Sequence, residues 1–209
     1  MFFYFGEIEL TGIILAGGKN KRIGKDKSFI KIGGITIIDR AFSTLSRIFK
    51  DIIIITDTPD LYSYLGCKIY SDIIPGKDSL GGIYTGLKVS SSKHNFIFAC
   101  DMPFLNESLI KYMIGITKDS DIVIPRSKKG FEPLHAIYSK VCIPYIEKLI
   151  EGNNLRILDF FTHVKVKEIG ISEIATYDPK EIAFLNLNTE EDILRAEAVE
   201  KSLYEEHEA

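Results

Sequence analysis

The stretch TGIILAGG occupies residues 11–18 and decides how the chain begins to fold. Its first part, residues 11–15, is a short apolar run, which is typical of a buried strand in a parallel sheet. Ala16-Gly17-Gly18 follow at once, and glycines there let the backbone turn and come close to a ligand. In open α/β sheets, ligands bind just beyond the carboxyl ends of the strands. The stretch therefore predicts a strand that ends in a ligand-binding loop.

The same alternation of short apolar runs and helical patterns continues along the chain. Further strands are predicted at 29–32, 52–55, 68–70, 96–100, 121–124, 136–138 and 164–166. Helices are predicted at 37–49, 60–65, 80–89, 106–117, 142–151 and 155–161. Thr189 and Asp192 have the spacing of a capping box that opens a last helix, whose charged end, residues 200–209, is expected to fray. We expect one α/β domain over residues 1–209 (core about 10–198), with three layers and a mostly parallel sheet.

The composition excludes several classes of protein. A chain of 209 residues with 45% hydrophobic content buries a core without needing disulfides. A net charge of −3 argues against a general nucleic-acid binder, which is usually basic. Three cysteines, with no C-x-x-C pair, are typical of a reducing compartment. No apolar run approaches the ~20 residues of a transmembrane helix. We therefore expect a soluble, cytoplasmic protein that binds neither nucleic acid nor membrane.

The loop after the first strand carries the strongest local signal. It reads LAGGKNKRIGKDK over residues 15–27, and its cations, with one more on the next predicted strand, are Lys19, Lys21, Arg22, Lys25, Lys27 and Lys31. Six cations against the single acid Asp26 make a positive patch that suits a triphosphate. The dinucleotide-binding and P-loop spacings both fail here, which disfavours an NAD-dependent oxidoreductase. On spacing alone, a solvated basic turn stays open as the alternative.

Acidic residues follow two of the predicted strands. Asp101 comes directly after the run 96–100, and Pro103 then stops strand pairing. A carboxylate at this position, facing the same crevice as the cationic loop, suits Mg²⁺ coordination. Asp72 stands after the strand 68–70 in the same way. From the residues alone, ordinary turn chemistry explains both acids at least as well as a ligand site does.

Five segments together resemble a known family. The pattern Leu-Ala-Gly-Gly-x-x-x-Arg-x-Gly-x-Asp-Lys at residues 15–27 resembles the opening motif of the molybdenum cofactor guanylyltransferases, the MobA-like branch of the nucleotidyltransferases, with Ile23 where Met is usual. The other four segments are Cys100–Pro103, similar to Cys-Asp-x-Pro; residues 78–83, similar to Gly-Pro-Leu-x-Gly-Ile but with Asp78 and Ser79 for its Gly and Pro; residues 133–138, similar to Pro-Leu-x-Ala-x-Tyr; and residues 186–189, similar to Asn-x-Asn-Thr. Residues 152–156 are similar to a stretch leading to the pterin side. The resemblance runs in order from Gly12 to about Ala196.

The resemblance implies a fold and a reaction. The fold is similar to the nucleotide-diphospho-sugar transferases and is Rossmann-like. The reaction transfers GMP from GTP to the phosphate of molybdenum-molybdopterin and releases pyrophosphate, with Mg²⁺ as the cofactor. Contacts with other cofactor-biosynthesis proteins or with target apoenzymes are further expected partners. The alternatives are a relative that uses CTP or a sugar 1-phosphate, and a non-catalytic nucleotide-binding regulator.

The resemblance also implies roles for individual residues. Leu15, Ala16 and Gly17 would hold the base through backbone groups. Lys27 would neutralise phosphate charge with help from Arg22, Asp72 would contact the nucleotide, and Asp101 would anchor Mg²⁺. Asn186 and Asn188 would reach the metal or phosphates, with a plain strand end and helix cap as an equal alternative. His135 is predicted to be structural or substrate-lining, and Thr56-Asp57 stands where some guanylyltransferases carry an Asn that holds guanine.

Overall fold

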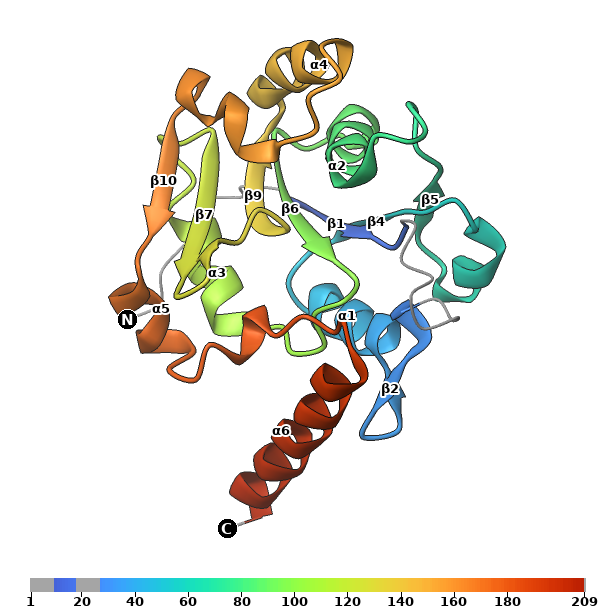
Figure 1. The fold of residues 1–209 in the computed structure, drawn as a ribbon, viewed down its shortest axis with the longest axis vertical. Helices are drawn as coiled ribbons and strands as arrows, with labels where there is room; N and C mark the ends of the chain where they lie inside the picture. The colour runs from blue at the N-terminus through green and yellow to red at the C-terminus, as the bar shows by residue number, and fades with distance from the viewer. Residues whose placement is uncertain (1–9, 18–26, 209) are drawn as a thin grey trace.

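The computed structural model describes residues 10–17 and 27–208 of the chain. Its centre is a sheet with the strand order β10-β7-β9-β6-β1-β4-β5, and β8 pairs with β7 beside it (Figure 1). The strands are β1 Thr11–Leu15, β4 Asp51–Ile55, β5 Lys68–Tyr70, β6 His94–Ala99, β7 Ile122–Ser127, β8 Gly130–Phe131, β9 His135–Ser139 and β10 Val166–Ile169. Strands β6, β1, β4 and β5 pair in parallel, as do β7 and β10. The predicted mostly parallel sheet is confirmed, and β9 runs antiparallel to both β6 and β7.

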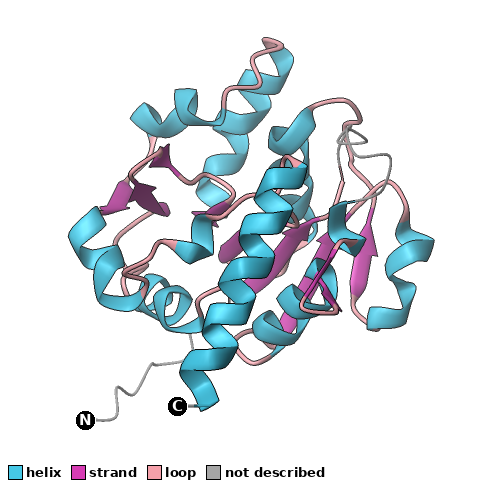
Figure 2. Ribbon diagram, turned by 60° about the horizontal axis from the view of Figure 1, so that its bottom comes forward, coloured by secondary structure: helices cyan, strands magenta, loops and turns pink. Residues whose placement is uncertain are grey.

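Helices cover both faces of this sheet (Figure 2). One face carries α1 Ile37–Ser46, α3 Glu107–Gly115, α5 Ile171–Tyr177 and α6 Glu190–Glu208. The other face carries α2 Asp78–Val89 and α4 Ile143–Glu151. Short 3₁₀ helices complete the layers: η2 Lys27–Phe29, η3 Pro59–Leu65, η4 Lys140–Cys142, η5 Ile157–His163 and η6 Ile182–Phe184. The predicted three-layer α/β fold is confirmed.

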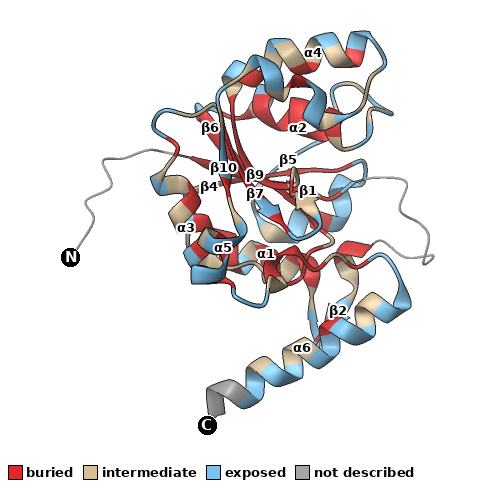
Figure 3. Cartoon of the chain, turned by 60° about the vertical axis from the view of Figure 1, so that its left-hand side comes forward, coloured by how far each residue is buried: buried red, intermediate tan, exposed pale blue. Residues whose placement is uncertain are grey.

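Alternating side chains along the strands join the sheet to the two helical layers. On β1, Ile14 packs into the layer of α1 and α3, whereas its neighbour Ile13 packs into the layer of α2 and α4. On β6, Phe96 and Phe98 face the first layer and Ile97 faces the second. Because successive residues of a strand point to opposite faces, a run of apolar residues is buried on both sides. Figure 3 shows these buried strands between the two sets of helices.

A small hairpin leads from η2 into α1. Its strands, β2 Lys31–Ile32 and β3 Ile35–Thr36, are antiparallel. Gly33 and Gly34 connect them with φ angles of 58° and 82°. A two-residue turn with positive φ at both positions is the one that matches the twist of the strands, and glycine adopts it without strain. The Gly33-Gly34 pair therefore sets the position of the hairpin that follows Lys27.

Several local predictions differ from the structure. The helix expected at 155–161 is the 3₁₀ helix η5, and α5 was not predicted. The end that was expected to fray is helical as far as it is described, because α6 continues to Glu208 and Glu200 pairs with Arg40 of α1 at 2.6 Å. The capping box is confirmed: the Asp192 amide donates to Thr189 Oγ1, and the Thr189 amide donates to Asp192 Oδ2. Within the described ranges, no helix has the length and apolar character needed to cross a membrane.

Candidate active site

Four parallel strands end level with one another at one edge of the sheet. Leu15 pairs with both Ile55 and Ala99, and Ile55 pairs in turn with Tyr70. The residues that follow these strands therefore lie side by side in the order of the sheet. From β6 to β5 they are Cys100-Asp101, Ala16-Gly17, Thr56-Asp57 and Ser71-Asp72. The strand pairing thus brings the sequence-predicted residues Gly17, Asp72 and Asp101 to one edge.

The segment Leu15 to Gly17 is held firmly between its neighbours. The Leu15 carbonyl accepts a hydrogen bond from the Cys100 amide at 3.0 Å, and the Ala16 amide donates to the Ile55 carbonyl at 2.9 Å. A Cβ atom at Gly17 would lie 3.7 Å from Thr56 Cα, so the loop starts in contact with the next strand end. A flat ligand that binds here meets a backbone of fixed shape. Residues 18–26 of the predicted loop, including Arg22, lie outside the described residues.

Lys27 re-enters the described structure at the start of η2. Although lysine is strongly hydrated, Lys27 is only 6% exposed. Its ammonium Nζ donates a hydrogen bond to Oδ1 of Asn188 at 2.8 Å. Burial raises the pKa of the Asp101 carboxyl, and the charge of Lys27 opposes that shift. Lys27 is therefore a buried cation at the edge where Asp101 ends a strand.

Asp101 carries an unpaired carboxylate oxygen. Among the described residues, its Oδ1 is buried and has no hydrogen-bond partner. Burial raises the pKa of the Asp101 carboxyl, whereas Lys27 and a backbone hydrogen bond act in the opposite direction. The Asp101 carbonyl accepts from the Leu187 amide at 2.8 Å, which ties the turn to the chain before α6. Because buried polar atoms normally have partners, the orphaned oxygen indicates a place for a cation.

Asp72 is half-buried against the start of α2. Thr85 Oγ1 donates to Asp72 Oδ1 at 3.4 Å and accepts from the Ile73 amide at 3.0 Å. Burial raises the pKa of the Asp72 carboxyl, and the negative charge of Asp57 raises it further, while the hydrogen bond from Thr85 lowers it. Asp57 itself is exposed. The two acids therefore border the same space at the ends of β4 and β5.

The turn before α2 forms although two family residues are replaced. Asp78 has a φ of 47°, in the left-handed region that favours glycine, and it stands where the related motif has Gly. A pocket of about 320 Å³ opens beside this turn. Its lining consists of Asp78, Ser79, Pro133, Leu155, Arg156, Ile157 and Leu158. The stretch resembling the pterin side thus meets the start of α2.

His135 lies in the core and not at the site. Its side chain is fully buried, and its ring packs edge-on against Phe96 and Phe184 with centroids 5.1 and 5.2 Å away. Burial lowers the pKa of its imidazole to about 3. The structural alternative for His135 is therefore correct, and the substrate-lining alternative is wrong. In contrast, the contact from Lys27 to Asn188 was not predicted, since no spacing in the sequence indicates it.

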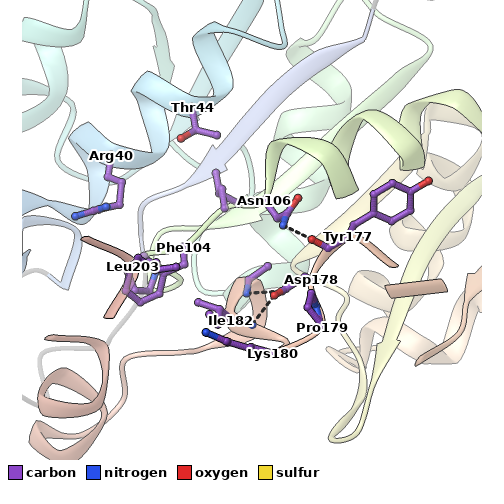
Figure 4. A pocket seen from close by; sticks show the side chains of 13 residues that line it. Arg40, Thr44, Phe104, Asn106, Tyr177, Asp178, Pro179, Lys180, Ile182 and Leu203 are labelled. Carbon is purple, nitrogen blue, oxygen red and sulfur yellow. Dashed lines mark hydrogen bonds between the residues drawn. The ribbon is translucent and has the colours of Figure 1, made fainter. Parts of the chain in front are cut away.

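A second pocket lies apart from the site residues. It has a volume of about 390 Å³ and sits between α1, residues 103–106, residues 177–183 and Leu203 of α6. Figure 4 shows Asp178 within it, whose carboxylate accepts from the amides of Ile182 and Ala183. None of the site residues predicted from the sequence lines this pocket. This pocket is therefore separate from the site at the strand ends.

Comparisons with known proteins place the chain in a family. The chain matches the MobA-like NTP transferase domain over residues 12–165. A relative named molybdenum cofactor guanylyltransferase from Desulfosudis oleivorans is 36% identical over 195 residues, which cover 92% of this chain and 96% of the relative. A probable molybdenum cofactor guanylyltransferase from Natranaerobius thermophilus is 37% identical and covers 90% of this chain and 94% of its own.

Solved structures share the fold. The molybdopterin-guanine dinucleotide biosynthesis protein A of Archaeoglobus fulgidus superposes with a TM-score of 0.82 at 24% identity, covering 92% of this chain and all (100%) of that chain. The 4-diphosphocytidyl-2C-methyl-D-erythritol synthase of Anaerococcus prevotii superposes with a TM-score of 0.69 at 19% identity, covering 92% and 96%. The match to the domain family over residues 12–165 and the identity to curated relatives show that the chain belongs to the MobA-like NTP transferases.

Proposed function

We propose that this nucleotidyltransferase moves GMP from GTP to the phosphate of molybdenum-molybdopterin. An oxygen of the acceptor phosphate attacks the α-phosphorus of GTP, the bond to the β-phosphate breaks, and pyrophosphate leaves with the displaced electron pair. The observation that carries the proposal is the buried Lys27, whose charge acts on Asp101, together with the buried, unpartnered Oδ1 of Asp101, at the edge where the Leu15–Gly17 segment begins its loop. Relatives that align over most of the chain are named molybdenum cofactor guanylyltransferase.

Lys27 and Asp101 supply opposite charges to this reaction. The Lys27 ammonium pairs with phosphate oxygens as negative charge develops on the leaving pyrophosphate. Because it is only 6% exposed, its charge is screened less than that of a solvated lysine. Arg22 assists from the loop, and Asp72 contacts the nucleotide on the other side. Catalysis then consists of positioning and charge neutralisation, without a covalent enzyme intermediate.

Enzymes of this family depend on a divalent metal ion, and Mg²⁺ is the ion we propose here. Asp101 fits it, because Oδ1 is a buried carboxylate oxygen without a partner among the described residues. The same part of the chain holds no cluster of three or more His, Cys, Asp or Glu that could bind a metal. Mg²⁺ suits such a sparse site, since it keeps several waters and takes further ligands from substrate phosphates. When bound, the ion would neutralise phosphate charge beside Lys27.

Asp57 supports guanine as the base. Guanine presents N–H donors on its pairing edge, and a carboxylate is a pure acceptor. Asp57 is exposed at the end of β4, and the start of the loop at Gly17 runs against the same strand end. Cytosine offers only its N4 amino group as a donor, beside the acceptors N3 and O2, whereas guanine offers N1–H and the N2 amino group side by side. Backbone groups of Leu15, Ala16 and Gly17 then border the base from the neighbouring strand.

The site of the reaction in the cell is the cytoplasm in this proposal. None of the three cysteines of the chain, Cys67, Cys100 and Cys142, forms a disulfide, which fits a reducing compartment. The product would pass to other cofactor-biosynthesis proteins or directly to target apoenzymes.

Pyrophosphate release tests the reaction. The protein is mixed with Mg²⁺, molybdenum-molybdopterin and one of GTP, CTP, ATP or UTP, and Asp101→Asn serves as the inactive control. We expect release with GTP that needs the pterin acceptor. Release with CTP alone, or with a sugar 1-phosphate as acceptor, would replace the guanylyl assignment by a related transferase. Binding of GTP without release in any mixture would leave a non-catalytic regulator.

A further inference from the structure

The chain before α6 reaches into the site at two neighbouring positions. The Leu187 amide donates to the Asp101 carbonyl at 2.8 Å, and Asn188 accepts from the Lys27 ammonium at 2.8 Å. Lys27 and Asn188 stand 161 positions apart in the sequence. The segment 187–188 thus contacts both the backbone of Asp101 and the side chain of Lys27.

Asn188 is itself fixed by the start of α6. Its amide donates to Asp192 Oδ2 at 2.9 Å, and the capping box of Thr189 and Asp192 follows directly. Leu187 on its other side is fully buried. Asn188 therefore has a fixed backbone, although its side chain reaches out from an exposed residue to a buried ammonium.

The same helix also holds the hairpin that follows Lys27. Glu197 accepts from the Gly33 amide at 3.2 Å, and Glu200 forms its ion pair with Arg40. A Cβ atom at Gly33 would lie 2.7 Å from Glu200 Cγ, so the turn and the helix are in close contact. Asn188 thus binds the Lys27 side chain itself, while the hairpin further along the chain is anchored separately to α6.

We propose that Asn188 is a positioning residue, which holds the Lys27 ammonium beside Asp101 before the triphosphate binds. This inference rests on the proposed function in that Lys27 is the group that meets the phosphates. A free lysine side chain samples many rotamers, and binding must otherwise remove that freedom. An oriented donor acts on developing charge without reorganisation, so fixing Lys27 in advance favours the reaction.

The amide is the appropriate chemistry for this task. A carboxylate at position 188 would also accept from Lys27, but its negative charge would offset the charge that the phosphates need. A neutral amide oxygen orients the ammonium and leaves its full charge for the ligand. An Asn that bound metal or phosphate directly would instead act independently of Lys27.

A double-mutant cycle separates these two roles. The variants are Asn188→Leu, which removes the acceptor at nearly constant size, Lys27→Met, and the double variant. We expect Asn188→Leu to lower kcat by roughly 10–100-fold with a smaller change in KM, because the Lys27 donor remains but is no longer oriented. In the Lys27→Met background, the same substitution should change kcat less than about two-fold. Losses that multiply in the double variant would show that Asn188 acts directly, and the proposal would be wrong.

Binding and chemical labelling test the same contact without turnover. In titrations with EDTA present, Asn188→Leu should lower the affinity for GTP when Lys27 is present. The same substitution should leave the affinity unchanged in the Lys27→Met background. Lysine acetylation followed by mass spectrometry should show that Lys27 reacts faster in Asn188→Leu, while the exposed Lys31 reacts as before. Asn188→Asp should keep Lys27 protected and still weaken GTP binding.

Glu200→Gln is the matched control, because it weakens another contact of α6 and leaves Asn188 in place. Its Lys27 labelling should match that of the wild type. Equal Lys27 labelling in the wild type and Asn188→Leu overturns the positioning role, whatever the activity is. Failure of the proposed function has a different signature: pyrophosphate is not released, while the labelling difference between these two proteins persists.

Discussion

Gly86 of α2 lies so close to Ile13 of β1 that a Cβ atom at Gly86 would be 2.8 Å from Ile13 Cγ2 and 2.9 Å from its Cδ1. This contact brings the helix that follows Asp72 directly onto the central strand of the site. In an open helix, Gly→Ala stabilises by about 1 kcal/mol. Here the added methyl group meets a β-branched side chain with little freedom at χ1, so the effect reverses.

We therefore predict that Gly86→Ala lowers the free energy of unfolding by about 1–3 kcal/mol through overpacking. Urea denaturation gives this difference from the midpoint at unchanged slope. As a control, the same substitution should be less harmful in an Ile13→Ala background, where the space is open. An unfolding midpoint above that of the wild type would contradict the close packing of α2 on β1.

Asp101→Asn should abolish turnover and leave the fold intact. The substitution removes the charge from a buried carboxyl whose pKa is already raised by burial, so thermal stability should stay equal or rise. Turnover should fall by at least about 10²-fold, because the amide is a poor ligand for Mg²⁺. Asp119→Asn, at an exposed position, is the control for both measurements. Wild-type activity of Asp101→Asn at limiting Mg²⁺ would remove Asp101 as the metal ligand.

Lys27→Ala should lower kcat/KM far more than Lys31→Ala. Lys27 is buried next to Asp101, and we expect a loss of about 10²–10³-fold as for other oriented donors. Lys31 is exposed on β2, where solvent and salt screen its charge, so a severalfold loss is the most we expect. Lys25→Ala, in the part of the loop outside the described residues, should resemble Lys31→Ala. Small, equal losses in all three variants would mean that the cations act only as a diffuse positive surface.

His135 should make the protein sensitive to acid. Its folded pKa of about 3 lies below the ordinary value of 6.5, so the unfolded chain takes up a proton that the folded protein does not. Stability contributed in this way is complete above about pH 6.5 and is lost as the pH falls toward 3, by up to a few kcal/mol. His135→Leu should therefore lose less stability than the wild type between pH 7 and pH 5 in urea titrations. The control His163→Gln, at an exposed position, should show the same dependence of stability on pH as the wild type. If the free energy of unfolding falls equally with pH in all three proteins, His135 is not the cause.

The strands of the site were predictable because each is a short run of apolar residues in the sequence. Residues 52–55 are four consecutive isoleucines, and a short β-branched apolar run is typical of a strand buried on both faces. The direction of β9 could not be read in this way, since its apolar residues look the same in either direction. Pairing with β6 and β7 alone decides it. Helix α5 was missed because it is seven residues long and buries only Ile174 fully, which leaves no periodic signal.

The site itself was predictable only in part. Asp101 stands directly after one predicted strand and Asp72 one residue beyond another, so the general rule for open α/β sheets brings them to one edge. The hydrogen bond from Thr85 to Asp72 joins residues 13 positions apart through the packing of α2, which no motif encodes. At Asp78 the structure keeps a turn although the residue of the motif is changed. Asp78 stands where the related motif has Gly, and it adopts the left-handed φ of 47° that this turn requires.

The pairing of Leu187 and Asn188 with the site has a consequence for how the protein is made. A ribosome adds residues at about 5–20 per second, so the 161 positions between Lys27 and Asn188 correspond to roughly 10–30 s of synthesis. During that interval the central strands emerge and pair, but neither the Lys27 ammonium nor the Asp101 carbonyl has its final partner. The newly made chain therefore folds its sheet first and gains a fully ordered triphosphate site last, when the segment leading into α6 leaves the ribosome.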